Sequence, residues 1–216
     1  LPDSDLSRKI SSIKMNAVTT KIDPAFINYT LGALQRYFPV SLEQAEILMG
    51  FCEMRYFDKR TIVLNEGERE EYLNMVINGL ARKYVRRGKS DVTLQLATEG
   101  HIIHSEISFL KRTPSPVVVE TIEPSTLISL SYQNMERALE SMPGADRMGR
   151  LLLVAMYVKK DERHYNQLHQ TTRERFLNYL KNHPHMLQRV PQKYLASYLN
   201  IKPETFSRLK HLVKLN

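Results

Sequence analysis

The sequence predicts an α+β protein: an N-terminal antiparallel β-roll of the jelly-roll type with flanking helices, a long helix, and an all-helical C-terminal domain. The distribution of glycine is the first observation, since all eight glycines lie at or before Gly149. Glycine marks turns and strand ends, so the front of the chain is turn-rich and the back is helical. We expect domain boundaries at residues 1–142, 143–169 and 170–216.

Short strand-like stretches separated by turn residues are the second observation. Regular spacing of such stretches is typical of an antiparallel sandwich or barrel. Asn78-Gly79 predicts a hairpin, because both residues tolerate positive φ. The predicted strands are Thr61–Leu64, Leu73–Ile77, Ala81–Val85, Val92–Ala97, Val117–Ile122 and Thr126–Leu130.

Helices are predicted at Pro24–Phe38 and Leu42–Cys52 before these strands, and at Gln133–Ser141 after them. A long helix follows from Gly144 to His169. Its apolar residues recur at alternating steps of three and four, which favours packing against a like helix and hence a homodimer. Packing of the same stripe on the chain's own roll is the alternative. The candidate dimerisation residues are Met148, Leu151, Ala155, Val158 and Tyr165.

The last 48 residues predict three short helices. Thr171 and Glu174 have capping-box spacing at the start of the first, and Pro184 ends it. The second begins at Pro191, and Asn200 is suited to the left-handed turn that follows. The third helix runs from Pro203 to about Val213.

The third helix has two chemically different sides. Phe206, Leu209 and Val213 fall on one side, and the opposite side carries polar residues suited to base edges and phosphates. Two helices joined by a tight turn, the second with such a face, predict a helix-turn-helix, although a generic αα-hairpin has a similar pattern. The polar side comprises Glu204, Ser207, Arg208 and His211.

Positive charge is concentrated in the same segment. Residues 169–216 hold nine of the 31 basic residues and two of the 23 acidic residues, a net charge of +7 within a chain total of +8. A localised positive field favours a polyphosphate partner. A basic surface with no specific partner is the alternative.

Several classes of protein are disfavoured by composition. The single Cys52 excludes an intramolecular disulfide framework and multi-cysteine metal or iron–sulfur sites. No apolar run approaches the roughly 20 residues of a membrane helix, and no secretory signal stands at the start, so we expect a cytoplasmic protein without a membrane partner.

We expect no enzyme activity, catalytic residue, cofactor or metal, because no nucleophile-elbow, phosphate-loop or metalloprotease motif is present. His101 and His104 lie three residues apart, a spacing that shares a strand face poorly. A metal-dependent enzyme using these histidines and Glu106 therefore remains only an alternative hypothesis.

Three local strings carry a family resemblance: VLNEGE at residues 63–68, VINGLAR at 76–82 and PETFSR at 203–208. With the order of parts, they make the chain similar to the Crp/Fnr family of bacterial transcription regulators over roughly residues 24–216. The resemblance implies a cyclic-nucleotide-binding-type roll, a dimerising central helix and a DNA-binding helix-turn-helix. It implies as partners double-stranded DNA, a second copy of the chain and an unidentified small-molecule effector, with RNA polymerase as a candidate partner.

The resemblance assigns base contacts to Glu204 and Arg208. Arginine can bind guanine O6 and N7 bidentately, and glutamate can accept from cytosine N4. Pro203 stands where the family has an arginine, and we expect no wing after Asn216. The further candidate DNA-binding residues are Lys193, Lys202, Thr205, Ser207, Lys210 and His211.

The resemblance also locates an effector site, which departs from the cyclic-AMP pattern. Glu106 matches the glutamate that holds the ribose, but Ser115 or Pro116 replaces the phosphate-binding arginine. A buried phosphate without a counter-charge is costly, so we expect an effector other than cyclic AMP. A small-molecule-binding module whose helical tail does not read DNA is the alternative. The candidate effector residues are Ser105, Glu106, Ile107, Ser115, Lys159 and Lys160.

Overall fold

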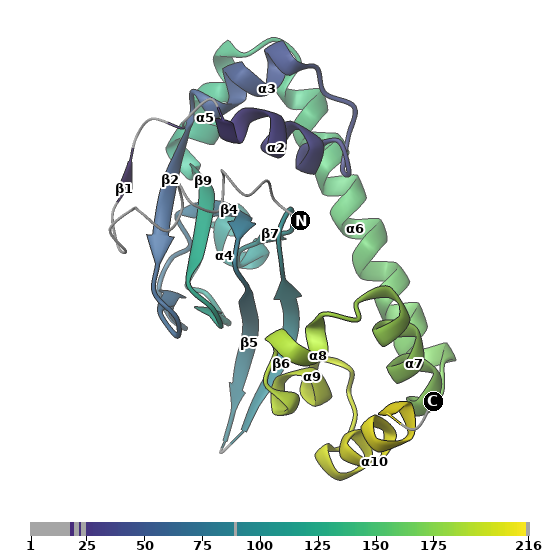
Figure 1. Cartoon of the computed structure of the whole chain (residues 1–216). Coiled ribbons are helices and arrows are strands. Elements are labelled where there is room, and N and C mark those ends of the chain that lie inside the picture. Colours follow the sequence, from purple (N-terminus) through teal and green to yellow (C-terminus); the bar gives the residue numbers. More distant parts are fainter. Residues whose placement is uncertain (1–17, 20–21, 23–24, 89, 215–216) are drawn as a thin grey trace.

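The computed structural model describes residues 18–19, 22, 25–88 and 90–214 (Figure 1). Two antiparallel sheets face each other and form a β-roll. The first has strand order β1-β2-β9-β4-β7 and the second β3-β8-β5-β6. The strands are β1 (Val18–Thr19), β2 (Cys52–Phe57), β3 (Ile62–Leu64), β4 (Tyr72–Asn78), β5 (Ala81–Arg87), β6 (Ser90–Ala97), β7 (Ile102–Ile103), β8 (Val118–Thr121) and β9 (Ser125–Ser131).

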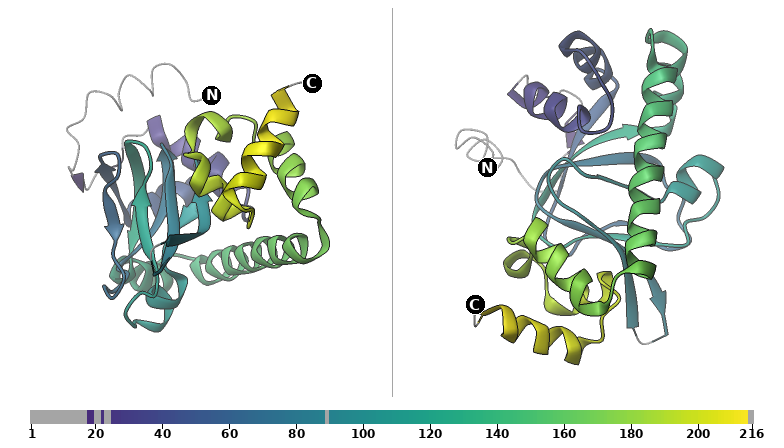
Figure 2. Two further views of the ribbon diagram at one scale, coloured as in Figure 1. Left: turned by 90° about the horizontal axis from the view of Figure 1, so that it is seen from below. Right: turned by 90° about the vertical axis from the view of Figure 1, so that its right-hand side faces the viewer.

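Helices cover one end of the roll and one of its sides. Figures 1 and 2 show α2, α3 and α5 gathered at one end, while α6 runs from there along the roll to the C-terminal helices. These helices and the short α4 have the following bounds: α2 Ala25–Leu34, α3 Leu42–Met49, α4 Glu106–Lys111, α5 Tyr132–Ser141 and α6 Ala145–His169.

The core has two parts within this N-terminal region. Between the sheets, Val76, Ala81 and Leu127 are fully buried. At the helical end, Phe26 of α2 and Met148 of α6 pack with residues of β2 and β4 in a second cluster. The first turns of α6 are therefore part of the roll's own core.

The predicted fold class is confirmed, and all six predicted strands are present. Four elements of this region were not predicted: β1, β2, β7 and α4. The helix expected at Leu42–Cys52 ends at Met49, and Cys52 begins β2 as a buried residue. Gly50 separates the helix from the strand, and alternate burial along β2 shows the period-two pattern that the sequence reading overlooked. Pro24, the predicted start of the first helix, lies outside the described residues.

The hairpin predicted at Asn78-Gly79 is wrong. β4 pairs with β9 and β7, whereas β5 pairs with β6 and β8, so the turn carries the chain from one sheet to the other. Of the two turn residues, only Gly79 adopts a positive φ, at 100°. A Cβ at Gly79 would lie 2.4 Å from Ser125 Oγ and 2.5 Å from the Pro124 carbonyl oxygen, so close packing also requires glycine there.

We predict that Gly79→Ala lowers the free energy of unfolding by about 2–4 kcal/mol, through backbone strain and a clash with neighbouring backbone. Gly88→Ala is the matched control, because Gly88 also has positive φ but a Cβ there meets nothing within 4 Å. Its cost is about 1 kcal/mol. Urea denaturation of both variants measures the difference, and equal losses would contradict the clash.

Candidate functional site

Four helices make up the C-terminal module, defined here as residues 170–214. They are α7 (Thr172–Asn182), α8 (Met186–Arg189), α9 (Gln192–Tyr198) and α10 (Pro203–Lys214). The predicted capping box of Thr171 and Glu174 is present. Asn200 adopts the expected left-handed conformation, with φ 54°, in the turn between α9 and α10. The short α8 was not predicted.

The apolar side of α10 is hidden within the module. Phe206 is fully buried and meets the ring of Phe176 edge-on, with 5.1 Å between centroids. Leu195 of α9 is buried in the same cluster, and Leu209 packs against it. The side chain of Val213 lies outside the described set. The α9–turn–α10 unit is thus fixed by a shared core.

The opposite side of α10 faces outward. Glu204, Arg208 and His211 are exposed, as is Lys202 in the preceding turn. On α9, Lys193 is exposed and its Nζ lies 4.9 Å from the centroid of the Tyr194 ring. The half-buried residues of the predicted DNA-binding set are Thr205, Ser207 and Lys210.

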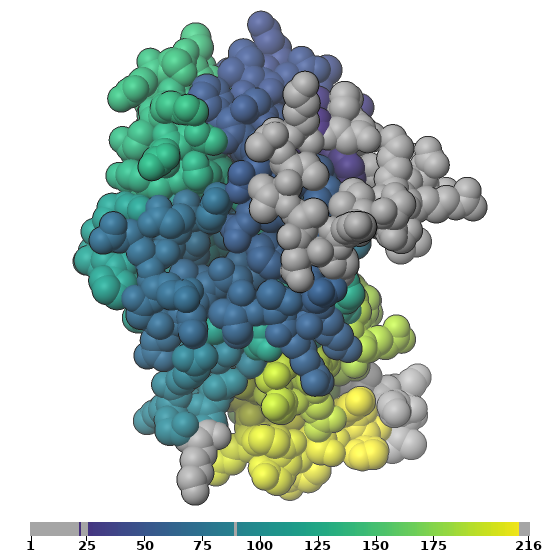
Figure 3. Space-filling model, turned by 90° about the vertical axis from the view of Figure 1, so that its left-hand side faces the viewer, coloured from purple at the N-terminus to yellow at the C-terminus, as the bar shows by residue number. Residues whose placement is uncertain are grey.

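The C-terminal module is docked on the roll, and Figure 3 shows their surfaces abutting. Leu80, Leu96 and Ile122 of the roll belong to the same apolar cluster as the module's core. Arg82 of β5 lies over the ring of Tyr194 at 3.8 Å and over that of Tyr84 at the same distance.

Two hydrogen-bonding contacts extend this interface. The Ser197 hydroxyl accepts from the backbone N–H of Thr93 at 2.9 Å. Arg163 of α6 donates to the carbonyl oxygens of Leu94 and Tyr198, so it links α6, β6 and α9. The module is therefore held by both the roll and α6.

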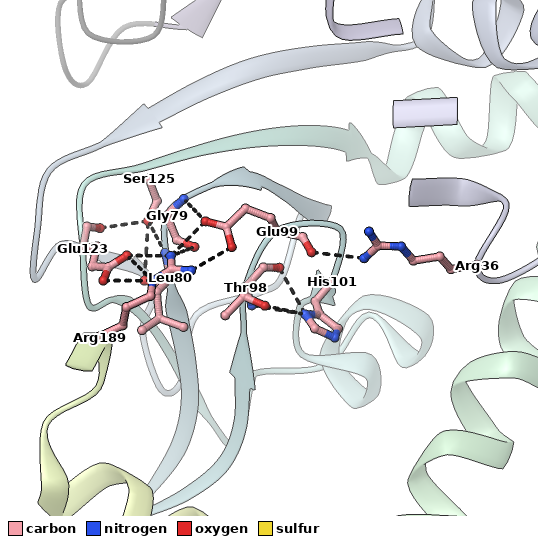
Figure 4. A network of polar contacts seen from close by, with 9 residues as sticks. All are labelled: Arg36, Gly79, Leu80, Thr98, Glu99, His101, Glu123, Ser125 and Arg189. Atoms are coloured by element: carbon pink, nitrogen blue, oxygen red, sulfur yellow. Dashed lines mark hydrogen bonds and ion pairs between the residues drawn. The ribbon is translucent and has the colours of Figure 1, made fainter. Parts of the chain in front are cut away.

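Arg189, at the end of α8, makes the densest polar contact of the interface (Figure 4). Its Nη2 lies 2.8 Å from Glu99 Oε1 and 2.7 Å from Glu123 Oε2, and it donates to the Gly79 carbonyl oxygen at 3.0 Å. Burial by itself would raise the pKa of Glu99, but hydrogen bonds from Arg189 outweigh it and hold that pKa below its usual value. We call the three side chains of Arg189, Glu99 and Glu123 the Arg189 clamp.

Two of the nine basic residues counted in the sequence therefore face inward. Besides Arg189, Arg175 donates hydrogen bonds from its guanidinium to backbone carbonyl oxygens, including that of Gln170 at 2.7 Å. The sequence offered a signal for the clamp, because Glu99 and Glu123 each stand at the end of a predicted strand. Their partner, Arg189, could not be picked out, because it lies in the basic segment that was expected to meet a polyphosphate.

An ion pair between the buried Lys83 and the partly exposed Glu106 occupies the position of the expected effector glutamate. Lys83 Nζ lies 2.7 Å from both carboxylate oxygens of Glu106 and donates to the His104 carbonyl oxygen at 3.0 Å. Burial lowers the pKa of Lys83, and the charge of Glu106 opposes this. Burial would raise the pKa of Glu106, but the lysine holds it below its usual value.

The cation that pairs with Glu106 thus comes from β5 and not from the predicted effector segment. Sequence reasoning missed Lys83, although strand alternation places it on the same face as Ala81, which is fully buried between the sheets. A lysine on that inward face needs an anionic partner, and Glu106, whose side chain is 36% exposed, supplies it.

The other predicted effector residues do not converge on one pocket. Ser105 is buried, and its N–H donates to the Glu70 carboxylate at 3.1 Å, where burial raises the pKa of Glu70 to about 7. The Ser115 hydroxyl donates to the Val117 carbonyl oxygen at 2.8 Å, and Ile107 is exposed. Lys159 and Lys160 lie on α6, and Lys159 faces a separate cavity.

The two histidines of the metal hypothesis have different partners. The ring of His101 contacts Thr98, whereas that of His104 packs edge-on against Phe109. Burial lowers the pKa of each imidazole to about 4. Over the described part of the chain, no group of three or more His, Cys, Asp or Glu side chains is placed to hold a metal ion.

The apolar seam predicted on α6 does not coincide with the apolar face that the helix exposes to solvent. Met148 is buried in the roll's core, and Leu151 packs against that core. Val158 and Tyr165 are exposed, as expected for an interface. The exposed stripe, as we call it, consists of Leu153, Val154, Tyr157, Val158, Tyr165 and Leu168.

Residues 54–142 match the family model described as the cyclic nucleotide-binding domain. No match was found among curated protein sequences. In the described residues, no helix combines the length and apolar character needed to cross a bilayer.

Solved structures of regulators share the fold. The c-di-GMP-responsive global regulator CLP of Xanthomonas campestris matches with a TM-score of 0.62 and 16% identity, over 81% of this chain and 92% of its own. The catabolite activator protein of Thermus thermophilus matches with a TM-score of 0.52 and 18% identity, over 83% of this chain and 86% of its own. FixK2 of Bradyrhizobium japonicum matches with a TM-score of 0.61 and 16% identity, over 76% of this chain and 85% of its own. The chain has the roll-and-helix fold of Crp/Fnr-type regulators.

We predict that Arg189→Gln lowers the free energy of unfolding by about 2 kcal/mol at pH 7, because two half-buried carboxylates lose their partner. The effect shrinks as pH falls below 4.5, the ordinary pKa of Glu99, since its depressed pKa contributes stability above that value and loses it on protonation. Urea titrations at pH 7 and pH 4 measure both.

Arg86→Gln is the control for this prediction. Arg86 pairs with Glu66 at 3.7 Å, with both side chains about half exposed, so its loss costs less than about 1 kcal/mol. An Arg189 effect no larger than the Arg86 effect would contradict a structural role for the clamp.

Proposed function

We propose that this chain is a homodimeric DNA-binding transcription regulator of the Crp/Fnr type that senses a ligand other than cyclic AMP through its roll. The observation that carries the proposal is the two-sided character of α10. Its apolar side is buried through Phe206, while Glu204 and Arg208 are exposed on the outside. A helix held in this way can enter a major groove without unfolding any part of the module.

The exposed side chains fit the two roles that a DNA interface needs. Arg208 can donate bidentately to a guanine and Glu204 can accept from a cytosine, which specifies sequence. Lys202, Lys210 and His211 suit phosphates, which position the protein without reading bases. Lys193 extends the positive surface onto α9.

Dimerisation is proposed through the exposed stripe of α6. Val154, Val158 and Tyr165 follow one another at heptad-like spacing, and the exposed Leu168 continues the pattern. A second copy would bury apolar side chains that otherwise face water. Two-fold symmetry would then present two α10 helices to successive major grooves, about 34 Å apart.

An effector other than cyclic AMP is supported by the Lys83–Glu106 pair. The glutamate expected to hold a ribose already has a buried cation on both oxygens. A ribose hydroxyl would have to replace the Lys83 ammonium on these oxygens, and a neutral hydroxyl is a weaker partner for a carboxylate than a cation. The proposed effector therefore binds at another place in the chain, or it differs chemically from a cyclic nucleotide.

A signal in the roll could reach the DNA interface through the docked surface. Regulation of this kind requires two arrangements of the module whose balance a ligand shifts. The Arg189 clamp joins the turns of the roll directly to α8. RNA polymerase, a candidate partner, would respond to the resulting complex on DNA.

We predict that Arg208→Ala weakens binding to a selected DNA site by about 1–3 kcal/mol and relaxes preference at one base pair. Competition binding against all four bases at each position measures this. Lys59→Ala, an exposed lysine on the roll, is the charge-matched control and should leave binding unchanged. Sequence preference that survives Arg208→Ala would count against the assignment and favour a tail that does not read DNA.

We predict that Val154→Asp converts the dimer to a monomer in sedimentation experiments at micromolar concentration, because a carboxylate would be buried in the seam. Leu177→Asp is the control, since Leu177 is a similarly exposed apolar residue on α7. Dimers that persist in Val154→Asp, or are lost equally in both variants, would place the interface elsewhere.

A further inference from the structure

A cavity of about 430 Å³ lies where the loop after α2, the turn between β6 and β7, and α6 come together. It is separate from the Lys83–Glu106 pair, and neither residue lines it. Its walls include Arg36 and Tyr37 from the loop, His101 from the turn, and Val158, Lys159 and Glu162 from α6.

The charges around this cavity are predominantly positive. Burial lowers the pKa of Lys159, and the positive charge of Arg36 lowers it further. Burial also lowers the pKa of His101, with additional effects from Lys159, Arg36 and His183. Glu162 is the single carboxylate among the lining residues. Cationic groups that disfavour one another's charge are relieved when an anion lies between them.

The rest of the lining is apolar. Ala155 and Val158 present aliphatic surface, and the hydroxyl of Tyr37 is already engaged, donating to the Gly100 carbonyl oxygen at 3.1 Å. The same hydroxyl accepts from the Ile102 backbone N–H at 3.3 Å, so its hydrogen bonds are made within the protein. Cationic groups beside an apolar wall are typical of sites for small amphipathic ligands.

We propose that this cavity binds a small organic anion, a phosphate or carboxylate group carried on an apolar body. Arg36 and Lys159 contact the anionic group, and Val158 and the ring of Tyr37 contact the apolar part. Lys159 is thereby placed in an effector site, but one formed within a single chain at the edge of the exposed stripe, with which it shares Val158, rather than inside the roll.

The position of the cavity connects it to the Arg189 clamp. Arg36 Nη1 lies 3.4 Å from the carbonyl oxygen of Glu99, and the carboxylate of Glu99 is bound by Arg189 on the other side (Figure 4). An anion that draws Arg36 away from this carbonyl oxygen acts directly on Glu99, which is part of the clamp. This regulatory consequence rests on the proposed function, whereas binding of the anion does not.

The test is calorimetric titration of the full chain with phenyl phosphate, inorganic phosphate and phenol. Phenyl phosphate combines both recognised groups, so we expect it to bind at least tenfold more tightly than either of the others. Lys159→Gln should weaken phenyl phosphate binding tenfold or more. Lys160→Gln, its neighbour outside the cavity lining, should leave binding unchanged.

A second readout locates the ligand. The imidazole of His101 should titrate with a higher pKa when phenyl phosphate is bound, because an adjacent anion favours the protonated ring. NMR of the histidine ring protons measures this, with His169, the last residue of α6 and outside the cavity lining, as the reference. No saturable binding at millimolar phenyl phosphate, an equal loss in both lysine variants, or an unchanged His101 pKa would overturn the proposal.

DNA binding is measured separately, so that the two proposals fail independently. Phenyl phosphate that binds the cavity of a chain with no affinity for any selected DNA would leave the anion site standing and remove the regulator. A chain that binds DNA equally well with and without saturated cavity would confirm the anion site and overturn its regulatory consequence.

Discussion

The bond between Arg189 and the carboxylates of Glu99 and Glu123 is the constraint on which the arrangement of the two parts depends. Apolar contacts through Leu80 and Leu96 are non-directional, and they would tolerate the C-terminal module in several orientations. A planar guanidinium held by two carboxylates fixes the orientation of α8, because its donors match only one geometry. The outward direction of α10 follows, since α8, α9 and α10 share one core. Gly79 takes part through its carbonyl oxygen, so the turn between the sheets is also a docking element.

Charge in this chain serves two purposes that composition does not separate. Lys83, Arg189 and Arg175 are used inside the protein, on Glu106, on the clamp carboxylates and on backbone carbonyls. Lys202 and Arg208 remain outside, where an anionic polymer could meet them. The cavity at Arg36 and Lys159 is intermediate, because its two cations are exposed and yet line a hollow together with one carboxylate. These differences in partners separate a structural cation from one available to a ligand.

Much of the fold could be predicted from the sequence, because glycine positions, strand alternation and caps are local properties. The capping box at Thr171 and the left-handed turn at Asn200 needed no tertiary information. Pairing of strands is not local, so Asn78-Gly79 was assigned to a hairpin when β4 and β5 belong to different sheets. α6 carries apolar residues on more than one face, and periodicity could not decide that Met148 packs inward while Val154 faces out. For the candidate site, the polar face of α10 was predictable from helical geometry, whereas Lys83, the Arg189 clamp and the Arg36–Lys159 cavity depend on residues far apart in sequence.

Selection of DNA from a random pool by the full chain tests the central claim most directly. The account predicts an inverted repeat whose half-sites are centred about one helical turn apart, since two α10 helices related by a two-fold axis must meet successive major grooves. Binding that depends on salt but enriches no sequence, or a single half-site without its repeat, would contradict it.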